Sequence, residues 1–479
     1  MRRTRSARSN QPLGLAALVV LGTAGAALAQ DDGLLAGAAT SRRLDMTAFS
    51  QPSANMTFER QLDFRVGDGI FRKLWVPSPS STKSSDGLGP LYNARGCQSC
   101  HIRDGRGQPP AAPGDTAVSM VLRLSIPPQT DDDRAALSQM LRNAIPEPVY
   151  GAQLQSFSVN GLLAEGRMAI AYREHAVTLA DGEVIKLRRP RYEVTDLNYG
   201  PLHPKVMLSP RVAPPMIGLG LLEMIPEAAI LKHADPEDSN SDGIAGRPNQ
   251  VWSHTEGKAM LGRFGWKAGM PTVPDQVADA FATDLGLSTY LLQTSHGDCT
   301  SAQKTCLELP TGNDPREQVE VPRKMFDLVV FYARNLAVPV QRATGDPAVQ
   351  RGKALFAAAG CSGCHIPGFV TASDPARPEH SGQAIFPYSD LLLHDMGEGL
   401  ADNRPEGQAS GRQWRTPPLW GIGLTRTVSG HDFMLHDGRA RGVLEAILWH
   451  GGEAEAARAR VQRMTRSERN DLLAFIHSL

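Results

Sequence analysis

The chain has 479 residues, which is long enough for two to four domains with sizeable hydrophobic cores. Lysine plus arginine and aspartate plus glutamate are equal, at 50 each, so net charge predicts no nucleic-acid or acidic-surface partner. Aromatic residues are sparse at 6%, whereas glycine (46) and proline (35) are plentiful, and this composition favours a loop-rich protein wrapped around a cofactor over a long helical bundle.

The N-terminus has the pattern of an export signal. Four arginines precede the short apolar run Leu13–Leu21, and Ala27-Leu28-Ala29 is a small-x-small cleavage site. We therefore predict a signal peptide over residues 1–29, a mature chain that begins at Gln30, and a periplasmic location. The apolar run is too short for a membrane anchor, and no later segment is long and apolar enough to predict a membrane span in the mature chain.

Residues 30–60 carry little periodicity and are predicted to form an N-terminal arm. A short helix is expected over Val66–Leu74, followed by a loop rich in serine and proline. This loop leads to Gly-Cys-Gln-Ser-Cys-His at 96–101, and a second such motif, Gly-Cys-Ser-Gly-Cys-His, occupies 360–365.

The spacing Cys-x-x-Cys-His is the signal for c-type haem attachment. The two thiols form thioethers to the haem, and the histidine binds the iron from the proximal side. Two copies in an exported chain predict two covalently bound haems. The residues assigned to them are Cys97, Cys100, His101, Cys361, Cys364 and His365.

Arg106 lies in the turn that follows the first motif and is a candidate partner for a haem propionate, although an exposed turn arginine is an equal alternative. From about 119 to 194 the sequence changes to short β-branched or alternating segments. The predicted strands are Val121–Ile126, Met168–Tyr172, Ala176–Leu179 and Glu183–Leu187. Asp181-Gly182 is a hairpin turn signal between the last two. We predict a β-rich insertion in the first half that serves as a cover or a partner-facing platform.

Asp235–Gly243 has a calcium-loop signature. Oxygen ligands recur on alternate residues at Asp238, Asn240 and Asp242, with Asp235 nearby, and this arrangement suits a hard cation. The twelfth loop position is Asn249 rather than glutamate, so the loop is not a full EF-hand, and an acidic surface turn is the alternative.

Two cysteines lie outside the haem motifs. Cys299 and Cys306 are predicted to form a local disulfide, as expected in an oxidising compartment. A redox-active dithiol is the alternative, but no neighbouring basic cluster would lower a thiol pKa.

Two amphipathic helices, Val321–Leu336 and Arg466–Leu479, mark the ends of the two halves. A turn at 345–347 separates the halves, and a helix from about Ala348 to Ala359 leads into the second motif. This order of elements predicts a mainly α fold with a β-rich insertion, built from two tandem cytochrome c-like domains at 61–340 and 345–479.

A weaker internal repeat supports the duplication. Pro214–Leu221 matches Pro417–Leu424, and an arginine precedes each copy (Arg211 and Arg415). A shared structural turn is the simplest interpretation, and such a stretch can also pack on a haem face.

Six stretches resemble the bacterial di-haem oxidoreductases labelled thiol oxidoreductase-like, which are related to the di-haem cytochrome c peroxidases. These stretches are Gly89-Pro90, Ala213–Glu227, Gly262–Ala268, Tyr388–Gly397, Trp414–Leu424 and His436–Ala454. The resemblance covers nearly all of the mature chain. It implies a fold of two cytochrome c domains and a peroxidase chemistry.

For the second haem, the candidate distal ligands are Met396, His394, His436 and His450. His450 is favoured because a glycine pair follows it, and because the corresponding position in the peroxidase relatives carries the sixth ligand, usually Met. A surface histidine at a helix end is the alternative.

The first haem has no comparable partner, since His254 and Met260 are only loose candidates. This asymmetry predicts an open site. In the peroxidase relatives peroxide binds at the first haem, where a carboxylate must move a proton. Asp284 and Glu223 are the candidates, with a structural role as the alternative for each. Trp266 is a candidate electron relay or a packing residue.

The predicted function is that of an exported di-haem c-type oxidoreductase, peroxidase-like, which passes electrons from the C-terminal haem to the N-terminal haem. A small redox protein, a cytochrome or a cupredoxin, would donate them, and a small oxidant such as peroxide would accept them. The alternatives are an electron-transfer protein with both irons six-coordinate, and an enzyme that oxidises a partner protein. The latter rests on kinship with the di-haem enzyme that matures methylamine dehydrogenase.

Overall fold

The computed structural model describes Met1, residues 33–111, Asp115 and residues 118–479. The predicted signal peptide and the first residues of the arm lie outside this part of the chain. Among the described residues, none of the helices has the length and apolar character needed to cross a membrane.

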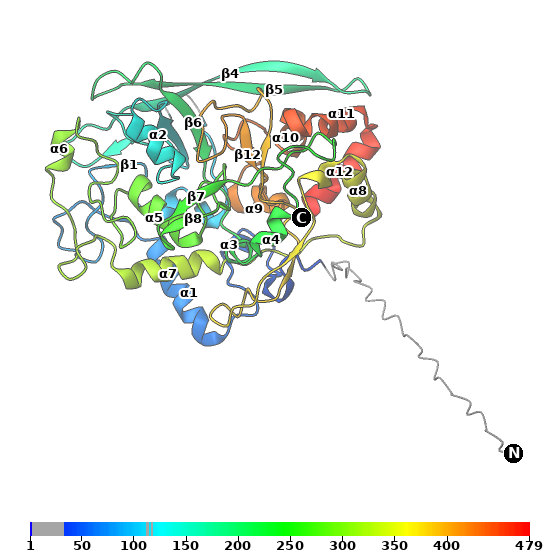
Figure 1. Cartoon of the computed structure of the whole chain (residues 1–479), viewed down its shortest axis with the longest axis horizontal. Helices are drawn as coiled ribbons and strands as arrows, with labels where there is room; N and C mark the ends of the chain where they lie inside the picture. The colour runs from blue at the N-terminus through cyan, green and yellow to red at the C-terminus, as the bar shows by residue number, and fades with distance from the viewer. Residues whose placement is uncertain (2–32, 112–114, 116–117) are drawn as a thin grey trace.

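Short helices and two-stranded antiparallel sheets make up the described part of the chain (Figure 1). The α-helices are α1 (Phe58–Phe71), α2 (Asp131–Ser138), α3 (Leu219–Glu223), α4 (Glu227–Leu231), α5 (Val273–Asp284), α6 (Lys304–Leu307), α7 (Arg323–Arg334), α8 (Pro347–Ala358), α9 (Thr425–Ser429), α10 (Val443–Trp449), α11 (Glu455–Arg463) and α12 (Arg466–Ser478). The strands pair as β1 (Leu91–Tyr92) with β3 (Phe157–Ser158), β2 (Met120–Ser125) with β6 (Met207–Val212), β4 (Arg167–Thr178) with β5 (Val184–Thr195), β7 (Gln250–Ser253) with β8 (Lys258–Leu261), β9 (Phe369–Val370) with β10 (Ala384–Ile385), and β11 (Leu393–Asp395) with β12 (Gln413–Arg415).

The prediction of a mainly α fold built from two tandem cytochrome c-like domains is wrong. Only 29% of the structure is helical, 17% is strand, and the sheets are small, so the fold is mixed. The prediction gave most weight to the helices that flank the two motifs. The long connections rich in glycine and proline instead run as loops and two-stranded ribbons, because these residues leave helices and strands short.

The predicted helices that flank the second motif are α8 and α12, which pack against each other. Asp346 caps α8 by accepting a hydrogen bond from the Ala348 amide at 2.7 Å, and Pro347 occupies the first turn. Gly352 lets the two helices approach closely, because a side chain there would clash with the backbone of α12. In the first half, α1 packs on α7 and begins inside the predicted arm, earlier than the expected Val66.

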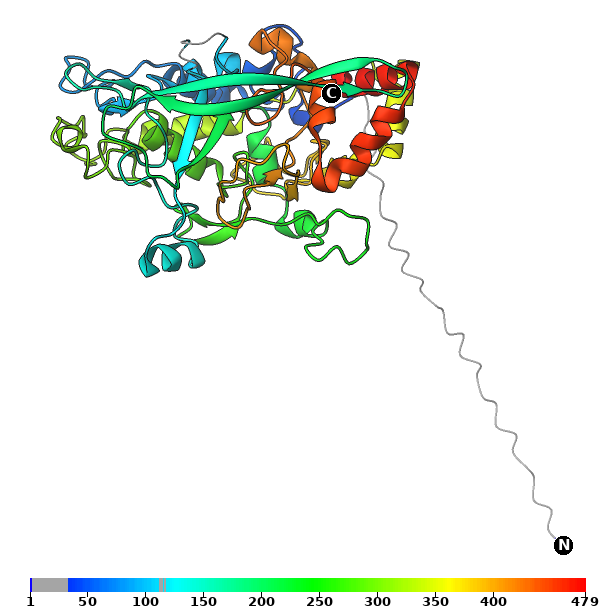
Figure 2. The ribbon, with the colours of Figure 1, turned by 90° about the horizontal axis from the view of Figure 1, so that it is seen from above.

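The predicted β-rich insertion contains one long hairpin, the β4–β5 ribbon (residues 167–195). Met168–Tyr172 and Ala176–Thr178 belong to one continuous strand, which ends one residue before the predicted Leu179. Asp181-Gly182 lies in the turn, as predicted. Figures 1 and 2 show the ribbon crossing the top of the molecule from the N-terminal half to the terminal helices. There the Ala180 amide donates to the Gln462 carbonyl at 3.0 Å, and Arg469 pairs with Asp181 at 2.8 Å. The ribbon therefore covers the C-terminal half although its sequence lies in the first.

One large hydrophobic core includes residues from both halves, from Leu35 to Leu479. At its centre the two copies of the internal repeat interlock. Gly218 and the aligned Gly421 both adopt left-handed backbone conformations, with φ of +73° and +74°. The ring of Trp420 packs against Gly218, and Ile217 packs against Gly421, so each copy inserts a side chain where the other lacks one.

Candidate functional site

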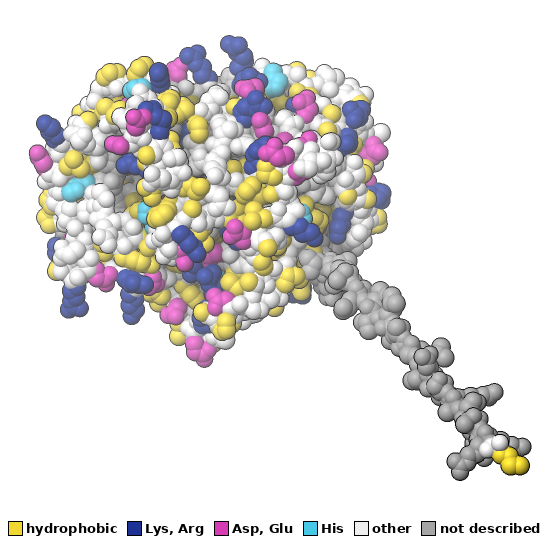
Figure 3. Space-filling view, in the orientation of Figure 1, with side chains coloured by type: hydrophobic (Ala, Val, Ile, Leu, Met, Phe, Trp, Pro, Cys, Tyr) yellow, Lys and Arg dark blue, Asp and Glu magenta, His cyan; other side chains and the backbone are white. Residues whose placement is uncertain are grey.

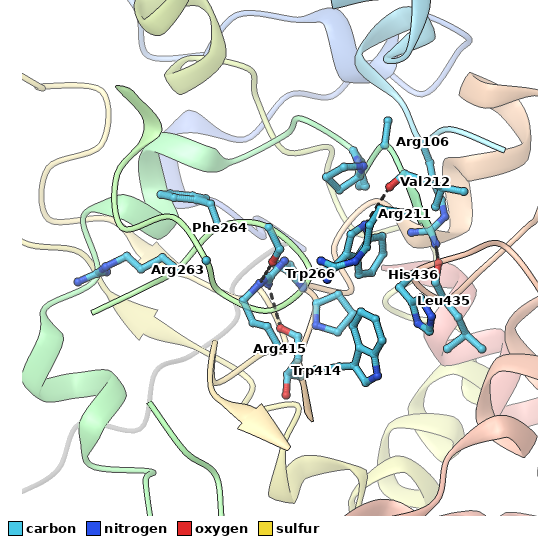
Figure 4. Close-up of a pocket in the computed structure, with 18 of the residues that line it drawn as sticks. Arg106, Arg211, Val212, Arg263, Phe264, Trp266, Trp414, Arg415, Leu435 and His436 are labelled. Atoms are coloured by element: carbon cyan, nitrogen blue, oxygen red, sulfur yellow. Dashed lines mark hydrogen bonds between the residues drawn. The ribbon is translucent and has the colours of Figure 1, made fainter. Parts of the chain in front are cut away.

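A continuous cavity of about 1110 Å³ lies between the two halves, and both Cys-x-x-Cys-His motifs line it. Apolar side chains from the repeat (Met216, Ile217, Leu419, Trp420) form part of its wall. A large, mostly apolar cavity with a few buried polar groups is typical of a cofactor site. Figure 4 shows the part of the wall that carries arginine and tryptophan side chains.

The two motif histidines are held in the same way. Each motif begins with a short 3-10 turn, Cys97–Ser99 or Cys361–Gly363, that brings the histidine back over the first cysteine. The Nδ1 atom of His101 lies 2.9 Å from the Pro214 carbonyl oxygen, and that of His365 lies 2.8 Å from the Tyr388 carbonyl oxygen. A carbonyl only accepts, so Nδ1 carries the proton in both rings.

Each ring therefore keeps an unprotonated Nε2 atom, which is the form that binds a metal. Burial lowers the pKa of both His101 and His365 to about 4, so both rings are neutral near pH 7. Both side chains line the cavity, which fits them to bind the iron of a cofactor held there.

The four motif cysteines are free thiols in the structure, while Cys299 and Cys306 form a disulfide. Burial raises the pKa of Cys97 to about 12 and that of Cys361 to about 11. Reactive cysteines need a lowered pKa, so these thiols are poorly suited to thiolate redox chemistry. Their place in the cavity wall fits covalent haem attachment.

His450 comes directly after α10 and lines the cavity near the second motif. Its Nδ1 atom lies 2.7 Å from the Ala446 carbonyl oxygen, so its Nε2 atom also carries a lone pair. Burial lowers the pKa of His450 as it does that of His365, and both rings line the same cavity. Met396 also lines the cavity.

The other two candidates for the second site are engaged elsewhere. The His394 Nε2 atom lies 2.8 Å from Asp390, and its Nδ1 atom lies 2.6 Å from Glu453, so carboxylates occupy both ring nitrogens. His436 stacks on Trp414, with ring centroids 3.7 Å apart. The His394 ring is therefore less free to bind a metal than that of His450, whereas stacking on Trp414 leaves the ring nitrogens of His436 unoccupied.

Asp284 ends α5 and lines the cavity on the side of the first motif. It accepts a hydrogen bond from Gln153 at 2.7 Å, and burial raises its pKa to about 6. Its charge adds to the effect of burial in raising the pKa of Cys97, so the carboxylate lies near that thiol. His254 also lines the cavity, whereas Met260 is not among the residues of its wall.

Glu223 has a different environment. Its carboxylate pairs with Arg334 at 2.7 Å and Arg377 at 2.6 Å, and it accepts the Val273 amide at the start of α5. It is not among the residues that line the cavity. These contacts hold α3, α5, α7 and the loop that carries Arg377 against one another.

Trp266 occupies a central position between the halves (Figure 4). Its indole N–H donates to the Val212 carbonyl at 2.8 Å, the Arg106 guanidinium lies 5.0 Å from its ring centroid, and its own carbonyl accepts from the Arg415 amide. Arg106 and Arg415 are buried, line the cavity, and have no carboxylate within ion-pairing distance among the described residues. They are therefore suited to hold an anionic group such as a haem propionate.

Two residues of the wall were not assigned a role from the sequence. In the sequence, Arg415 is only the arginine that lies two positions before the second repeat copy, Pro417–Leu424. Arg123 lies inside a predicted strand, and its only sequence signal is that it is a lone arginine among apolar residues. In the structure it lines the cavity near the first motif and pairs with Asp279 at 2.8 Å.

The 235–243 loop gives the calcium prediction no support. In the described part of the chain, no three His, Cys, Asp or Glu side chains gather in a way that could hold a metal ion. Asp238 instead accepts the Gly243 amide at 3.1 Å, and Asp242 accepts the Ile244 amide at 2.8 Å. Asn249 is buried, and its amide donates to the Lys267 carbonyl at 2.8 Å.

No curated protein matches the chain. Among solved structures, hydrazine synthase from Kuenenia stuttgartiensis, pressurised with xenon, is 19% identical over 38% of this chain and 63% of its own chain, with a TM-score of 0.22. This chain thus spans less than two thirds of that neighbour, and at this TM-score the similarity supports no argument about fold or function.

A family model described as “Di-haem oxidoreductase, putative peroxidase” matches residues 36–479. The match covers nearly all of the described chain, including both motifs and the walls of the cavity between them. It confirms the resemblance that the sequence stretches indicated. The chain belongs to the di-haem oxidoreductase family.

Proposed function

We propose that the protein is an exported di-haem c-type oxidoreductase with peroxidase-like activity. The observation that carries the proposal is the single cavity lined by both motifs, in which His101 and His365 each direct an unprotonated nitrogen away from a backbone carbonyl. Haems attached there would supply one-electron redox chemistry and a metal site for a small oxidant.

Cys97, Cys100 and His101 would hold one haem, and Cys361, Cys364 and His365 the other. Arg106 and Arg415 would neutralise propionates. His450 would close the second site as its distal ligand, because its Nε2 atom is left free and its ring lines the same cavity as His365. Met396 is the alternative ligand from the same wall.

Asp284 would act as the acid/base group of the first site. Moving a proton between peroxide oxygens needs a group that gains and loses a proton near the working pH. A buried carboxylate with a pKa of about 6 that lines the cavity meets this need, whereas the Glu223 carboxylate is neutralised by two arginines outside the cavity. We therefore place Glu223 among the residues that hold the fold.

The two sites would then have different tasks. Electrons would enter at the C-terminal site, which is closed by a protein ligand, and the oxidant would be reduced at the N-terminal site. Trp266 lies between the halves, in contact with Arg106 and Arg415, and is the residue best situated to relay electrons. Reduction of one hydrogen peroxide to two waters takes two electrons and two protons, so two one-electron donors are oxidised for each peroxide.

The test is to express the full chain in a host with c-type haem maturation and to recover it from the periplasm. Acid–acetone extraction should leave two haems on the polypeptide, and mass spectrometry should show cleavage before Gln30. The reduced protein should consume hydrogen peroxide with two donors oxidised per peroxide. Two covalent haems without peroxide turnover would favour the electron-transfer alternative, and no covalent haem would refute the proposal.

A further inference from the structure

We propose that the middle of the β4–β5 ribbon is the docking surface for an acidic electron-donor protein, at the point where the ribbon covers the second site. This inference rests on the proposed function, since it assigns the partner of that site. The surface comprises Arg173, His175, Arg189 and Arg191, which are all exposed.

The first observation is charge. Arg173 and Arg189 lie directly opposite each other in the strand register, and like charges in that position destabilise a ribbon. Neither has a carboxylate partner among the described residues, and Arg191 follows two positions after Arg189. Figure 3 shows lysine and arginine side chains along the upper edge of the molecule, where the ribbon lies in Figure 1. An unneutralised pair of arginines, here Arg173 and Arg189, steers an acidic partner.

The acidic groups near this cluster are already paired. Glu174 lies 3.9 Å from Lys186 and 3.3 Å from Arg441, and Glu193 pairs with Arg191 at 2.8 Å. At the far end of the ribbon, Asp181 and Glu183 are bound by Arg469. Arg188 also lacks a carboxylate partner, but it is half-buried and donates to the Gly438 and Arg439 carbonyls. The exposed surplus positive charge therefore lies on the Arg173–Arg189 pair.

The second observation concerns the residue packed beneath this part of the ribbon. His175 contacts the Trp449 ring edge-on at a centroid distance of 5.1 Å, and Arg189 lies 5.9 Å from the same ring. Trp449 directly precedes His450. The charged surface is therefore separated from the proposed distal ligand by one buried aromatic residue.

A small cavity of about 420 Å³ lies at the same place, lined by His175, Arg189 and Trp449 and floored by Met396 and Gly451. Met396 also lines the main cavity, so this is a thin part of the wall of the second site. A donor seated over the cavity would be close to that site. Transient redox encounters need only a small contact area, which a ribbon face provides.

The ribbon is less suited to a second copy of this chain. Both of its outer edges are free of strand partners in the described structure, which would invite strand addition. However, Pro190 and the charged side chains of β5 interrupt the edge, and such residues oppose edge-to-edge pairing.

The experiment compares the full-length holoprotein with the double variant Arg173→Glu/Arg189→Glu. A strongly acidic reduced cupredoxin, a strongly basic one and dithionite are the three reductants, and stopped-flow absorbance follows haem reduction at low and high salt. The matched control is Arg65→Glu/Lys324→Glu, which reverses two exposed charges on α1 and α7 on the opposite side of the molecule.

We expect the double variant to lower the second-order rate with the acidic cupredoxin at least tenfold at low salt, and to remove the decrease of the wild-type rate with salt. The rate with dithionite should be unchanged, and the control should change the acidic-cupredoxin rate less than twofold. Equal effects of the two double variants would overturn the proposal, as would a wild-type preference for the basic cupredoxin. A ribbon-dependent dimer in sedimentation would assign the surface to a second copy instead.

The outcomes separate this inference from the function on which it rests. If dithionite reduces both haems normally but the acidic donor does not distinguish the variants, the docking surface is wrong and the function stands. If no covalent haem is present, the proposed function fails before docking is measured.

Discussion

The two motif sites hold their histidines in the same way and differ in the residues that line the cavity around them. In both, a neutral histidine is fixed by a backbone carbonyl, at Pro214 or Tyr388. The cavity wall near the first motif carries the charged side chains of Asp284 and Arg123. The wall near the other motif carries His450 and Met396 instead. The proposed function therefore assigns cofactor attachment to the two Cys-x-x-Cys-His motifs, and it assigns the difference between the two sites to segments that are distant in sequence.

The largest expected effect comes from removing one attachment site. Changing Cys361 and Cys364 to serine should leave one covalent haem per chain, and the same change at Cys97 and Cys100 should remove the other. Intact mass and the pyridine haemochrome absorbance measure both. Each single-haem protein then gives the spectrum of one site alone, and identical spectra would contradict the difference between the sites.

The next largest effect concerns the acid/base group. Asp284→Asn keeps the shape of the side chain but cannot exchange a proton, so peroxide reduction should fall about 10²-fold or more, in the range typical of general acid–base groups. Haem content should not change. Glu223→Gln is the matched control: it should lower thermal stability, because it weakens two ion pairs, and leave the rate per folded molecule nearly unchanged. A smaller loss for Asp284→Asn than for Glu223→Gln would reverse the assignment.

Variants of His450 test which residue is the distal ligand of the second haem. His450→Ala should convert the low-spin signal of that haem to high-spin and leave the first haem largely as it was. His450→Met should raise the potential of the same haem, because thioether ligation favours the reduced iron. Met396→Leu is the control and should keep the low-spin signal. Loss of that signal in Met396→Leu, but not in His450→Ala, would exchange the two roles.

Sequence analysis predicted well where local signals act. The helices at 323–334, 347–358 and 466–478 follow from apolar periodicity and from caps such as Asp346. The family followed from stretches such as 213–227, and the turn of the long hairpin followed from Asp181-Gly182. These features depend on residues that are neighbours in the chain.

The fold class and the cavity walls opposite the two motifs could not be predicted in the same way, because they depend on contacts between residues that lie hundreds of positions apart in the chain. The β4–β5 ribbon reaches the C-terminal half, and Trp420 packs onto Gly218. Neither contact leaves a periodic signal. The carboxylates of the 235–243 loop match a cation-binding spacing, yet they accept hydrogen bonds from the loop's own amides.

The smallest expected effect is the pH dependence of stability. Burial raises the pKa of Asp284 in the folded chain from 3.8 to about 6, so the folded state holds this proton more tightly than the unfolded state. The free energy of unfolding should therefore fall as pH rises from about 4 to 6, by on the order of 2–3 kcal/mol for this group. Asp284→Asn should lose this part of the dependence. Chemical denaturation of the wild type and of Asp284→Asn, both with the same haem content, at pH 4.5 and 7.5 measures it, and parallel curves for the two proteins would contradict the assignment.

The measurement that tests the central claim most directly is a cyanide titration of the ferric wild-type protein, followed by optical and EPR spectroscopy. A closed second site and an open first site predict one low-spin and one high-spin haem per chain, with one cyanide bound and only the high-spin signal converted. Two low-spin haems that bind no cyanide would contradict the claim and identify an electron-transfer protein with both irons closed.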